Sequence, residues 1–179
     1  PTLYTSEIFN LFVLDTIINS DGSSVKSFND YYNKRFKHFF RPDGTKERSI
    51  YYNSNETKTR EYVFNSTGRL VWELNYDVNG HQWNIQFYDP NRNIKKMVIY
   101  GPNRIKEEEN RFHPNGNEKS VLSYRLDGTK ERIMYLRPNG FLKSIVFYKP
   151  NGTKKTKILY NHNGSSLTKT FYYDDSGKS

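Results

Sequence analysis

A twelve-residue period of glycine runs through most of this chain and limits what it can fold into. Eight glycines are separated by multiples of twelve residues: Gly44, Gly68, Gly80, Gly116, Gly128, Gly140, Gly152 and Gly164. Glu56, Arg92 and Arg104 occupy the three positions of this series that lack glycine. A short internal repeat at a fixed spacing indicates that one small structural unit recurs many times along the chain.

Other residue types keep the same phase. The position before each glycine slot holds Asn or Asp, with Thr67 as the exception, and proline often stands one position earlier still. An aromatic residue stands four positions before the slot in nearly every repeat: Phe40, Tyr52, Phe64, Tyr76, Tyr88, Tyr100, Phe112, Tyr124, Tyr148 and Tyr160. Leu136 is the exception, and Tyr172 continues the series. Chance does not align three residue types over so many periods, so the repeat is structural.

The repeated Pro-Asn-Gly pattern is typical of a tight turn. Proline presets the backbone of a type I turn, and glycine then takes the left-handed conformation that closes a bulged hairpin. Glu56, Arg92 and Arg104 must adopt positive φ, or their turns must differ. Each period leaves room for about one strand and none for a crossover helix. The sequence therefore predicts an all-β fold, a long single-layer antiparallel meander of about eleven strands.

The first thirty residues lack this phase. The segment TSEIFNLFVLDTIINS is rich in apolar residues and is followed by an Asp-Gly turn. We expect a lead-in segment over residues 1–30, either a strand or a short helix with the strand preferred, and a repeat domain over residues 31–179. Because the chain begins at Pro1 and ends within the pattern at Ser179, we also expect it to be a segment of a longer protein.

The turn geometry predicts which residues face each other across neighbouring strands. Each aromatic should pair with the residue six positions later, and lysine stems should lie on the tyrosine rings in cation–π contact. One face should carry an apolar stripe: Ile50, Tyr62, Leu74, Val98, Leu122, Met134, Val146 and Ile158. Four pairs of this kind are the candidate ligand-binding residues: Tyr52, Lys58, Tyr100, Lys106, Tyr124, Lys130, Tyr148 and Lys154.

Several kinds of chemistry are excluded by composition. There is no cysteine, so disulfides, thiolate metal sites and a cysteine nucleophile are ruled out. The four histidines share no spacing that suits a metal site or a catalytic triad, and no glycine-rich phosphate loop opens a helix. Nor is there an apolar run long enough for a membrane span. We expect no catalytic residue, no metal and no cofactor in this chain.

The charge of the chain points to an anionic partner. The formal net charge is +9, and only 34% of the residues are hydrophobic. Neither face of the expected sheet is cleanly apolar or polar, which invites self-association or docking of another domain at a face or edge. Lysines beside tyrosines also occur in proteins that bind single-stranded nucleic acid. That arrangement first serves to hold a single-layer sheet together, so we do not favour nucleic acid as the partner. A polyanionic glycan is electrostatically just as acceptable.

The repeats resemble a known family. Segments such as FRPDGTKERSIYYN and YRLDGTKERIMYLRPNGFLKSIVFYKPNG look like the β-meander domain of bacterial glycosyltransferases related to glycosyltransferase family 4. That family includes poly(glycerol-phosphate) α-glucosyltransferases of teichoic acid synthesis and the enzymes that glycosylate serine-rich adhesins. The resemblance covers roughly residues 28–177. It implies a module that accompanies a two-lobed nucleotide-sugar transferase and takes part in acceptor binding or oligomer assembly. None of the catalytic residues of those lobes has a counterpart here.

These observations lead to one functional hypothesis and one alternative. The hypothesis is a non-catalytic acceptor-binding or oligomerisation module of a bacterial hexosyltransferase that acts on teichoic acid or an adhesin. Its partners would be an anionic glycopolymer or an acceptor glycoprotein, together with other copies or domains of the parent. The expected location is the cytoplasm, with any attachment to the membrane surface made through the parent. The alternative is a repeat-built protein-interaction domain of an unrelated bacterial protein.

Overall fold

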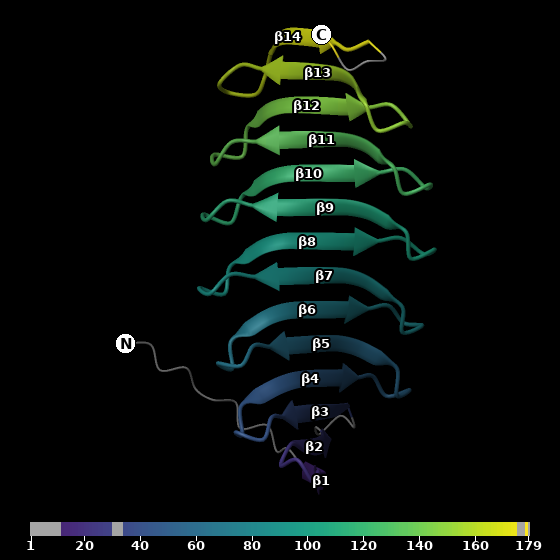
Figure 1. The fold of residues 1–179 in the computed structure, drawn as a ribbon, viewed down its shortest axis with the longest axis vertical. Coiled ribbons are helices and arrows are strands. Elements are labelled where there is room, and N and C mark those ends of the chain that lie inside the picture. Colours follow the sequence, from purple (N-terminus) through teal and green to yellow (C-terminus); the bar gives the residue numbers. More distant parts are fainter. Residues whose placement is uncertain (1–11, 30–33, 175–177, 179) are drawn as a thin grey trace. The chain divides into compact units, whose positions relative to one another are not determined.

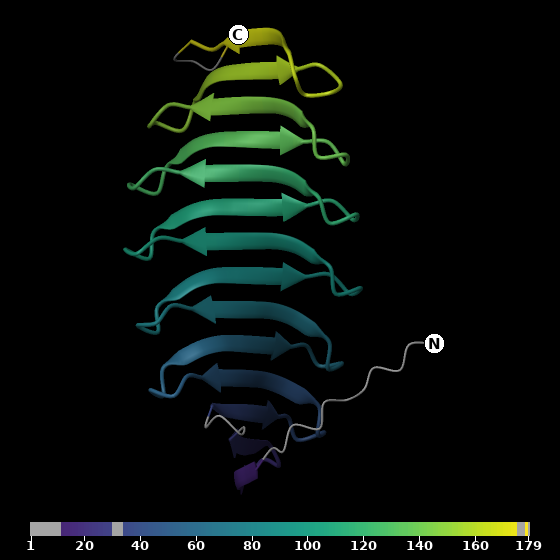
Figure 2. The same cartoon turned by 180° about the vertical axis from the view of Figure 1, so that it is seen from behind.

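The computed structural model describes residues 12–29, 34–174 and 178, and every regular element in them is a β-strand (Figures 1 and 2). The chain divides into two compact units, residues 1–81 and residues 82–179. The first unit holds β1 (Phe12–Ile18), β2 (Ser24–Asn29), β3 (Arg35–Phe40), β4 (Lys46–Tyr52), β5 (Lys58–Phe64) and β6 (Leu70–Tyr76). The second unit holds β7 (Gln82–Tyr88), β8 (Ile94–Tyr100), β9 (Lys106–Phe112), β10 (Glu118–Tyr124), β11 (Lys130–Leu136), β12 (Leu142–Tyr148), β13 (Lys154–Tyr160) and β14 (Leu167–Tyr172).

Both units are antiparallel meanders, in which each strand pairs with its neighbour in the sequence. This confirms the predicted all-β meander class, with fourteen strands in the described residues instead of about eleven. β1 and β2 come from the lead-in stretch and form a hairpin around Gly22, so the described part of this stretch has the preferred strand structure and not the short helix. Residues 1–11 and 30 lie outside the described residues, and the division into residues 1–30 and 31–179 stays a prediction.

The turns have the conformation that the repeat predicts. In the first of them, the Gly44 amide donates to the Arg41 carbonyl at 2.9 Å, and the Arg41 amide donates to the Thr45 carbonyl at 2.9 Å. Glu56, Arg92 and Arg104 adopt positive φ, at 60°, 66° and 59°, which confirms that their turns match those closed by glycine. A side chain at such a φ is strained because its Cβ crowds the following carbonyl.

We expect Arg92→Gly to raise the free energy of unfolding by about 1 kcal/mol, because glycine removes this strain. The reciprocal change, Gly152→Ala at φ 84°, should lower it by a similar amount. Urea denaturation of both variants measures the two effects. Equal stabilities for the wild type and both variants would contradict the account of the turns.

A one-residue bulge follows almost every turn and changes which side chains share a face. In β4 and β5, Tyr52 pairs with Lys58 and Tyr51 with Arg60, so Thr59 has no opposite residue in the register. The register confirms the predicted pairing of an aromatic with the residue six positions later. The pairing is present at every described turn within each unit from β3 to β13. The pairs are Phe40–Lys46, Tyr52–Lys58, Phe64–Leu70, Tyr88–Ile94, Tyr100–Lys106, Phe112–Glu118, Tyr124–Lys130, Leu136–Leu142 and Tyr148–Lys154.

The predicted apolar stripe is wrong in alternate strands. Ile50 faces Glu61 instead of Tyr62, and Leu122 faces Ile133 instead of Met134. The bulge inserts one residue into each hairpin, and a shift of one residue moves a side chain to the opposite face of a sheet. In the first unit, Tyr62 therefore lies on the face opposite Ile50 and Leu74. In the second unit, Met134 and Ile158 lie on the face opposite Val98, Leu122 and Val146.

The buried residues are small or paired, as a single layer requires. In the first unit, the face that carries buried Ile50 also carries the buried carboxylate of Glu61. In the second unit, buried Val98 and Val146 lie in one row with buried Glu109. Long neighbouring side chains cover these residues because lysine, arginine and tyrosine stems bury their apolar parts along the sheet. The two glutamates are part of the candidate site.

Candidate functional site

Six of the eight candidate binding residues form one row in the second unit. Tyr100 with Lys106, Tyr124 with Lys130, and Tyr148 with Lys154 are register pairs beside the β8–β9, β10–β11 and β12–β13 turns. Every second turn of a meander returns to the same side, so these pairs lie at the same end of the strands (Figure 1). Successive pairs are two strands apart, about 10 Å. We call these six residues the Tyr–Lys row. Tyr52 and Lys58 form an equivalent pair in the first unit.

The cation–π contacts differ in detail from those predicted. The ammonium of Lys106 lies 4.9 Å from the ring centroid of Tyr124, on the strand after its own, although Tyr100 is its register partner. Lys58 similarly lies 4.8 Å from the ring of Tyr76. These two lysines therefore stand between two tyrosines, and each contacts the ring on the following strand.

Two buried glutamates hold some of these lysines in place. Glu61 accepts from Lys58 at 2.9 Å and from the Tyr76 hydroxyl at 3.0 Å, and the guanidinium of Arg48 lies 3.6 Å away. Burial acts to raise the pKa of Glu61, but the hydrogen bonds from Lys58 and Tyr76 and the charge of Arg48 outweigh it and hold that pKa below its usual value. The ammonium of Lys58 is thus already matched by a carboxylate.

The same arrangement recurs 48 residues later in the second unit. The carboxylate of Glu109 forms ion pairs with the ammonium groups of Lys96 at 3.3 Å and Lys106 at 3.4 Å, and with the guanidinium of Arg111 at 3.3 Å. Burial acts to raise the pKa of Glu109 as well, but the charges of Lys96 and Lys106 outweigh it and lower that pKa. Lys106 is therefore a structural cation, whereas Lys130 and Lys154 of the same row are exposed to solvent.

The positive charge is segregated along the chain. Residues 82–179 contain 18 of the 28 lysines and arginines and 9 of the 19 acidic residues. Residues 1–81 contain ten of each, so the whole formal net charge of +9 belongs to the second unit. The net charge of the whole chain hides this difference, whereas the charges of each half, counted separately along the sequence, show it. A strongly basic surface raises the local concentration of anionic ligands.

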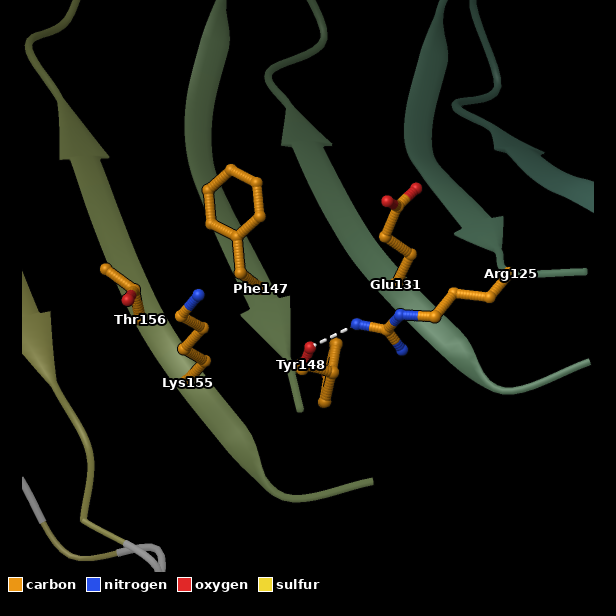
Figure 3. Close-up of a pocket in the computed structure, with 6 residues that line it drawn as sticks. All are labelled: Arg125, Glu131, Phe147, Tyr148, Lys155 and Thr156. Atoms are coloured by element: carbon orange, nitrogen blue, oxygen red, sulfur yellow. Dashed lines mark hydrogen bonds between the residues drawn. The ribbon is translucent and has the colours of Figure 1, made fainter. Parts of the chain in front are cut away.

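A shallow hollow of about 330 Å³ lies in the second unit at the same end of the strands as the Tyr–Lys row (Figure 3). It is on the opposite face, because Phe147 and Thr156 alternate with Tyr148 and Lys154 along their strands. Residues of four neighbouring strands or their turns line it: Arg125, Glu131, Phe147, Tyr148, Lys155 and Thr156. The guanidinium of Arg125 donates to the Tyr148 carbonyl at 2.5 Å and to the Thr129 hydroxyl at 3.2 Å. Sequence reasoning selected Tyr148 but none of the other five, because their approach depends on how successive turns stack.

His38 lies in an aromatic cluster of the first unit. The Phe28 and Phe36 rings stack with centroids 5.1 Å apart, and the imidazole lies 5.3 Å from each of them. Burial among these rings and the nearby charge of Lys46 lower the pKa of His38 to about 4. In the described part of the chain no three His, Asp or Glu residues gather as a metal site would need.

We expect acid to destabilise the first unit through His38. The unfolded chain protonates this residue near pH 6.5 and the folded chain near pH 4, so its contribution is complete above pH 6.5 and is lost as the pH falls towards 4. The urea midpoint should decline over that window, and His38→Phe should flatten the decline. The lowered pKa of Glu61 acts only below about 4.5, where that carboxyl group titrates in an unfolded chain. An identical decline in His38→Phe would contradict this assignment.

Comparison with known proteins identifies no family. No protein-family model matches the chain, and no curated protein matches it either. One similar solved structure is the GtfA/B complex bound to UDP and GlcNAc, with 11% identity and a TM-score of 0.42 over 72% of this chain and 24% of that one. Another is a porin-like protein from Bacteroides uniformis, with 11% identity and a TM-score of 0.28 over 87% of this chain and 62% of that one. The chain thus spans about a quarter of the first of these proteins and less than two thirds of the second.

Within the residues described, no helix is present that could cross a lipid bilayer.

Proposed function

We propose that this chain is a non-catalytic module of a bacterial glycosyltransferase, and that its second unit holds an anionic acceptor polymer. The observation that carries the proposal is the concentration of the whole net charge of +9 in residues 82–179, where exposed lysines stand beside a row of tyrosines. Lys130 and Lys154 would pair with phosphate groups of the polymer, and the rings of Tyr124 and Tyr148 would contact its sugar or glycerol units.

A repeating surface suits a repeating ligand. The Tyr–Lys row presents the same pair of groups about every 10 Å, so a polymer with regular charges meets equivalent groups at successive strands. Several weak contacts on one polymer add up because each bound unit raises the effective concentration of the next. This supports a polymer over a small substrate as the main ligand.

The class of the parent enzyme comes from the resemblance of the repeats. Teichoic acid is an anionic glycerol-phosphate polymer, and its α-glucosyltransferases belong to the family that the repeats resemble. We therefore propose a hexosyltransferase of teichoic acid or adhesin glycosylation as the parent. Its nucleotide-sugar donor favours the cytoplasm as the compartment.

Calorimetric titration with three polymers tests the proposal. We expect poly(glycerol phosphate) to bind to the 179-residue chain, with an affinity that falls as the salt concentration rises from about 0.05 to 0.5 M, because salt screens exposed charges. Neutral dextran should not bind. Equal or tighter binding of a single-stranded oligonucleotide would favour a nucleic-acid role, and the absence of salt-sensitive binding would refute the proposal.

A specific observation supports the alternative of a protein-interaction domain. β1 exposes Val13, Leu14, Ile17 and Ile18, each by more than half, on a unit with no net charge. Exposed apolar strands at a sheet edge pair readily with other chains or domains. Concentration-dependent association in sedimentation that is lost in Ile17→Lys would support this second role, and a chain that remains monomeric would count against self-association.

A further inference from the structure

We infer that the hollow lined by Arg125, Glu131, Phe147, Lys155 and Thr156 is a subsite for one polyhydroxylated unit that carries a single anionic group, such as a sugar or polyol phosphate. The inference deepens the proposed function and rests on it, since the unit would belong to the same acceptor polymer where it passes from the Tyr–Lys row around the end of the strands to the other face. Figure 3 shows the side chains of Glu131 and Phe147 pointing the same way from neighbouring strands, with Lys155 extending from β13 towards Phe147.

The lining groups match such a ligand in chemistry. The half-buried ring of Phe147 provides an apolar floor, and the carboxylate of Glu131 and the hydroxyl of Thr156 can hydrogen-bond to hydroxyl groups. The exposed ammonium of Lys155 can pair with an anion. Two cations against one carboxylate leave an excess of positive charge, which favours a ligand with an anionic group.

Arg125 gives the hollow a fixed wall. Its guanidinium donates to the carbonyls of Lys130 and Tyr148 and to the Thr129 hydroxyl, so it ties its own turn to the end of β12. A side chain held by several hydrogen bonds loses little conformational freedom when a ligand arrives. Its positive charge therefore faces the hollow from a position set before binding.

The hollow departs from the repeat that surrounds it. In the preceding pair of hairpins, 24 residues earlier, Gly101 stands in place of Arg125, Ser123 in place of Phe147, and Glu131 in place of Lys155. The depression beside Gly101 measures only about 50 Å³. Since the backbone of the two turns is alike, a set of residues needed only for folding would recur at both. The hydrogen bonds of Arg125 do recur, since Arg41 and Arg137 donate in the same way to the Phe64 and Tyr160 carbonyls. The ring of Phe147 and the ammonium of Lys155 have no counterpart beside Gly101, and they point instead to a ligand.

Lys143 offers a matched control for Lys155. Both lysines are exposed, and each is the residue that the register skips just after a turn, Lys143 in β12 and Lys155 in β13. They lie beside turns at opposite ends of the strands, because successive turns of a meander alternate sides. Lys155→Gln and Lys143→Gln thus remove the same charge from equivalent backbone positions, but only the first changes the hollow.

The test is a titration of the ¹⁵N-labelled 179-residue chain with glucose 1-phosphate, followed by amide chemical shifts. We expect saturable shifts at Glu131, Phe147 and Lys155, about fivefold to tenfold weaker binding in Lys155→Gln, and unchanged binding in Lys143→Gln. Glucose alone and inorganic phosphate alone should each bind more weakly. Glucuronate tests a carboxylate as the anionic group, and equally tight binding at the same amides would support the shared chemistry.

Three outcomes would overturn the subsite. These are the absence of localised shifts, equal losses in the two lysine variants, and binding of inorganic phosphate as tight as that of the ester. Phe147→Leu adds a readout independent of charge, since it should weaken glucose 1-phosphate and spare inorganic phosphate. Binding of poly(glycerol phosphate) that persists without these shifts would refute the subsite alone. Binding of glucose 1-phosphate in the hollow, without binding of poly(glycerol phosphate) to the chain, would refute the proposed function alone.

Discussion

Replacement of Glu61 by glutamine is expected to lower the free energy of unfolding by about 2–3 kcal/mol, the largest effect on stability among the changes considered. Glu61 is 8% exposed, and its carboxylate contacts Lys58, Arg48 and the Tyr76 hydroxyl. Glutamine keeps the volume but removes the charge, which leaves two part-buried cations without their counter-charge. Both cations retain access to solvent, so the loss should fall short of that for a fully buried pair.

Urea denaturation of three variants measures this effect. Glu47→Gln is the matched control, because Glu47 is an exposed carboxylate of the same unit and its replacement should change stability by less than about 0.5 kcal/mol. Glu109→Gln should reproduce the loss in the second unit, where three cations lie within 3.4 Å of the carboxylate. If Glu61→Gln were as stable as Glu47→Gln, the buried carboxylate would not organise the lysines of its face.

Removal of two exposed lysines is expected to weaken polymer binding by about fivefold to thirtyfold, while stability stays unchanged. The variant is Lys130→Gln with Lys154→Gln, which takes two cations from the Tyr–Lys row at its exposed positions. Each exposed charge pair contributes up to about 1 kcal/mol, so two together give a change of this size. The loss should shrink as salt is added, because the contribution is electrostatic.

The control for this variant removes the same charge from the first unit. Lys37 and Arg69 are exposed there, and Lys37→Gln with Arg69→Gln should leave the affinity for poly(glycerol phosphate) within about twofold. Calorimetric titration of the three proteins separates a local effect from one of total charge. Equal losses in both double variants would show that the polymer senses only the net charge and would contradict a binding surface in residues 82–179.

The lysines of the predicted site have two different roles: Lys58 and Lys106 stabilise the sheet, whereas Lys130 and Lys154 are proposed to bind the polymer. Lys58 and Lys106 were selected with Lys130 and Lys154 because all four occupy equivalent places in the repeat. The structure ties the first two to Glu61 and Glu109, which makes their replacement a change in stability. Each glutamate stands three positions after its lysine in the same strand, and only the bulge between them brings the two side chains to the same face. Sequence spacing alone predicts the opposite face.

The amino-acid sequence by itself determined the local geometry of this protein. A twelve-residue period with Asn-Gly or Asp-Gly turns leaves room for one strand per repeat, and it correctly predicted the meander and the aromatic register pairs. At Arg92 it left two alternatives, a positive φ or a different turn, and the structure has the positive φ. These are local properties, since backbone conformation at a turn depends on the few residues within it. The lead-in stretch, which has no such period, was left open between strand and helix.

The tertiary structure alone decided which side chains meet. The bulges reversed the face of alternate strands, so that Ile50 faces Glu61, and the stacking of turns brought Arg125 to the Tyr148 carbonyl and opened the hollow beside Phe147. A shift of one residue exchanges the two faces of a strand, and contacts between hairpins 24 residues apart depend on the sum of many such shifts. No pattern within a single repeat contains that sum.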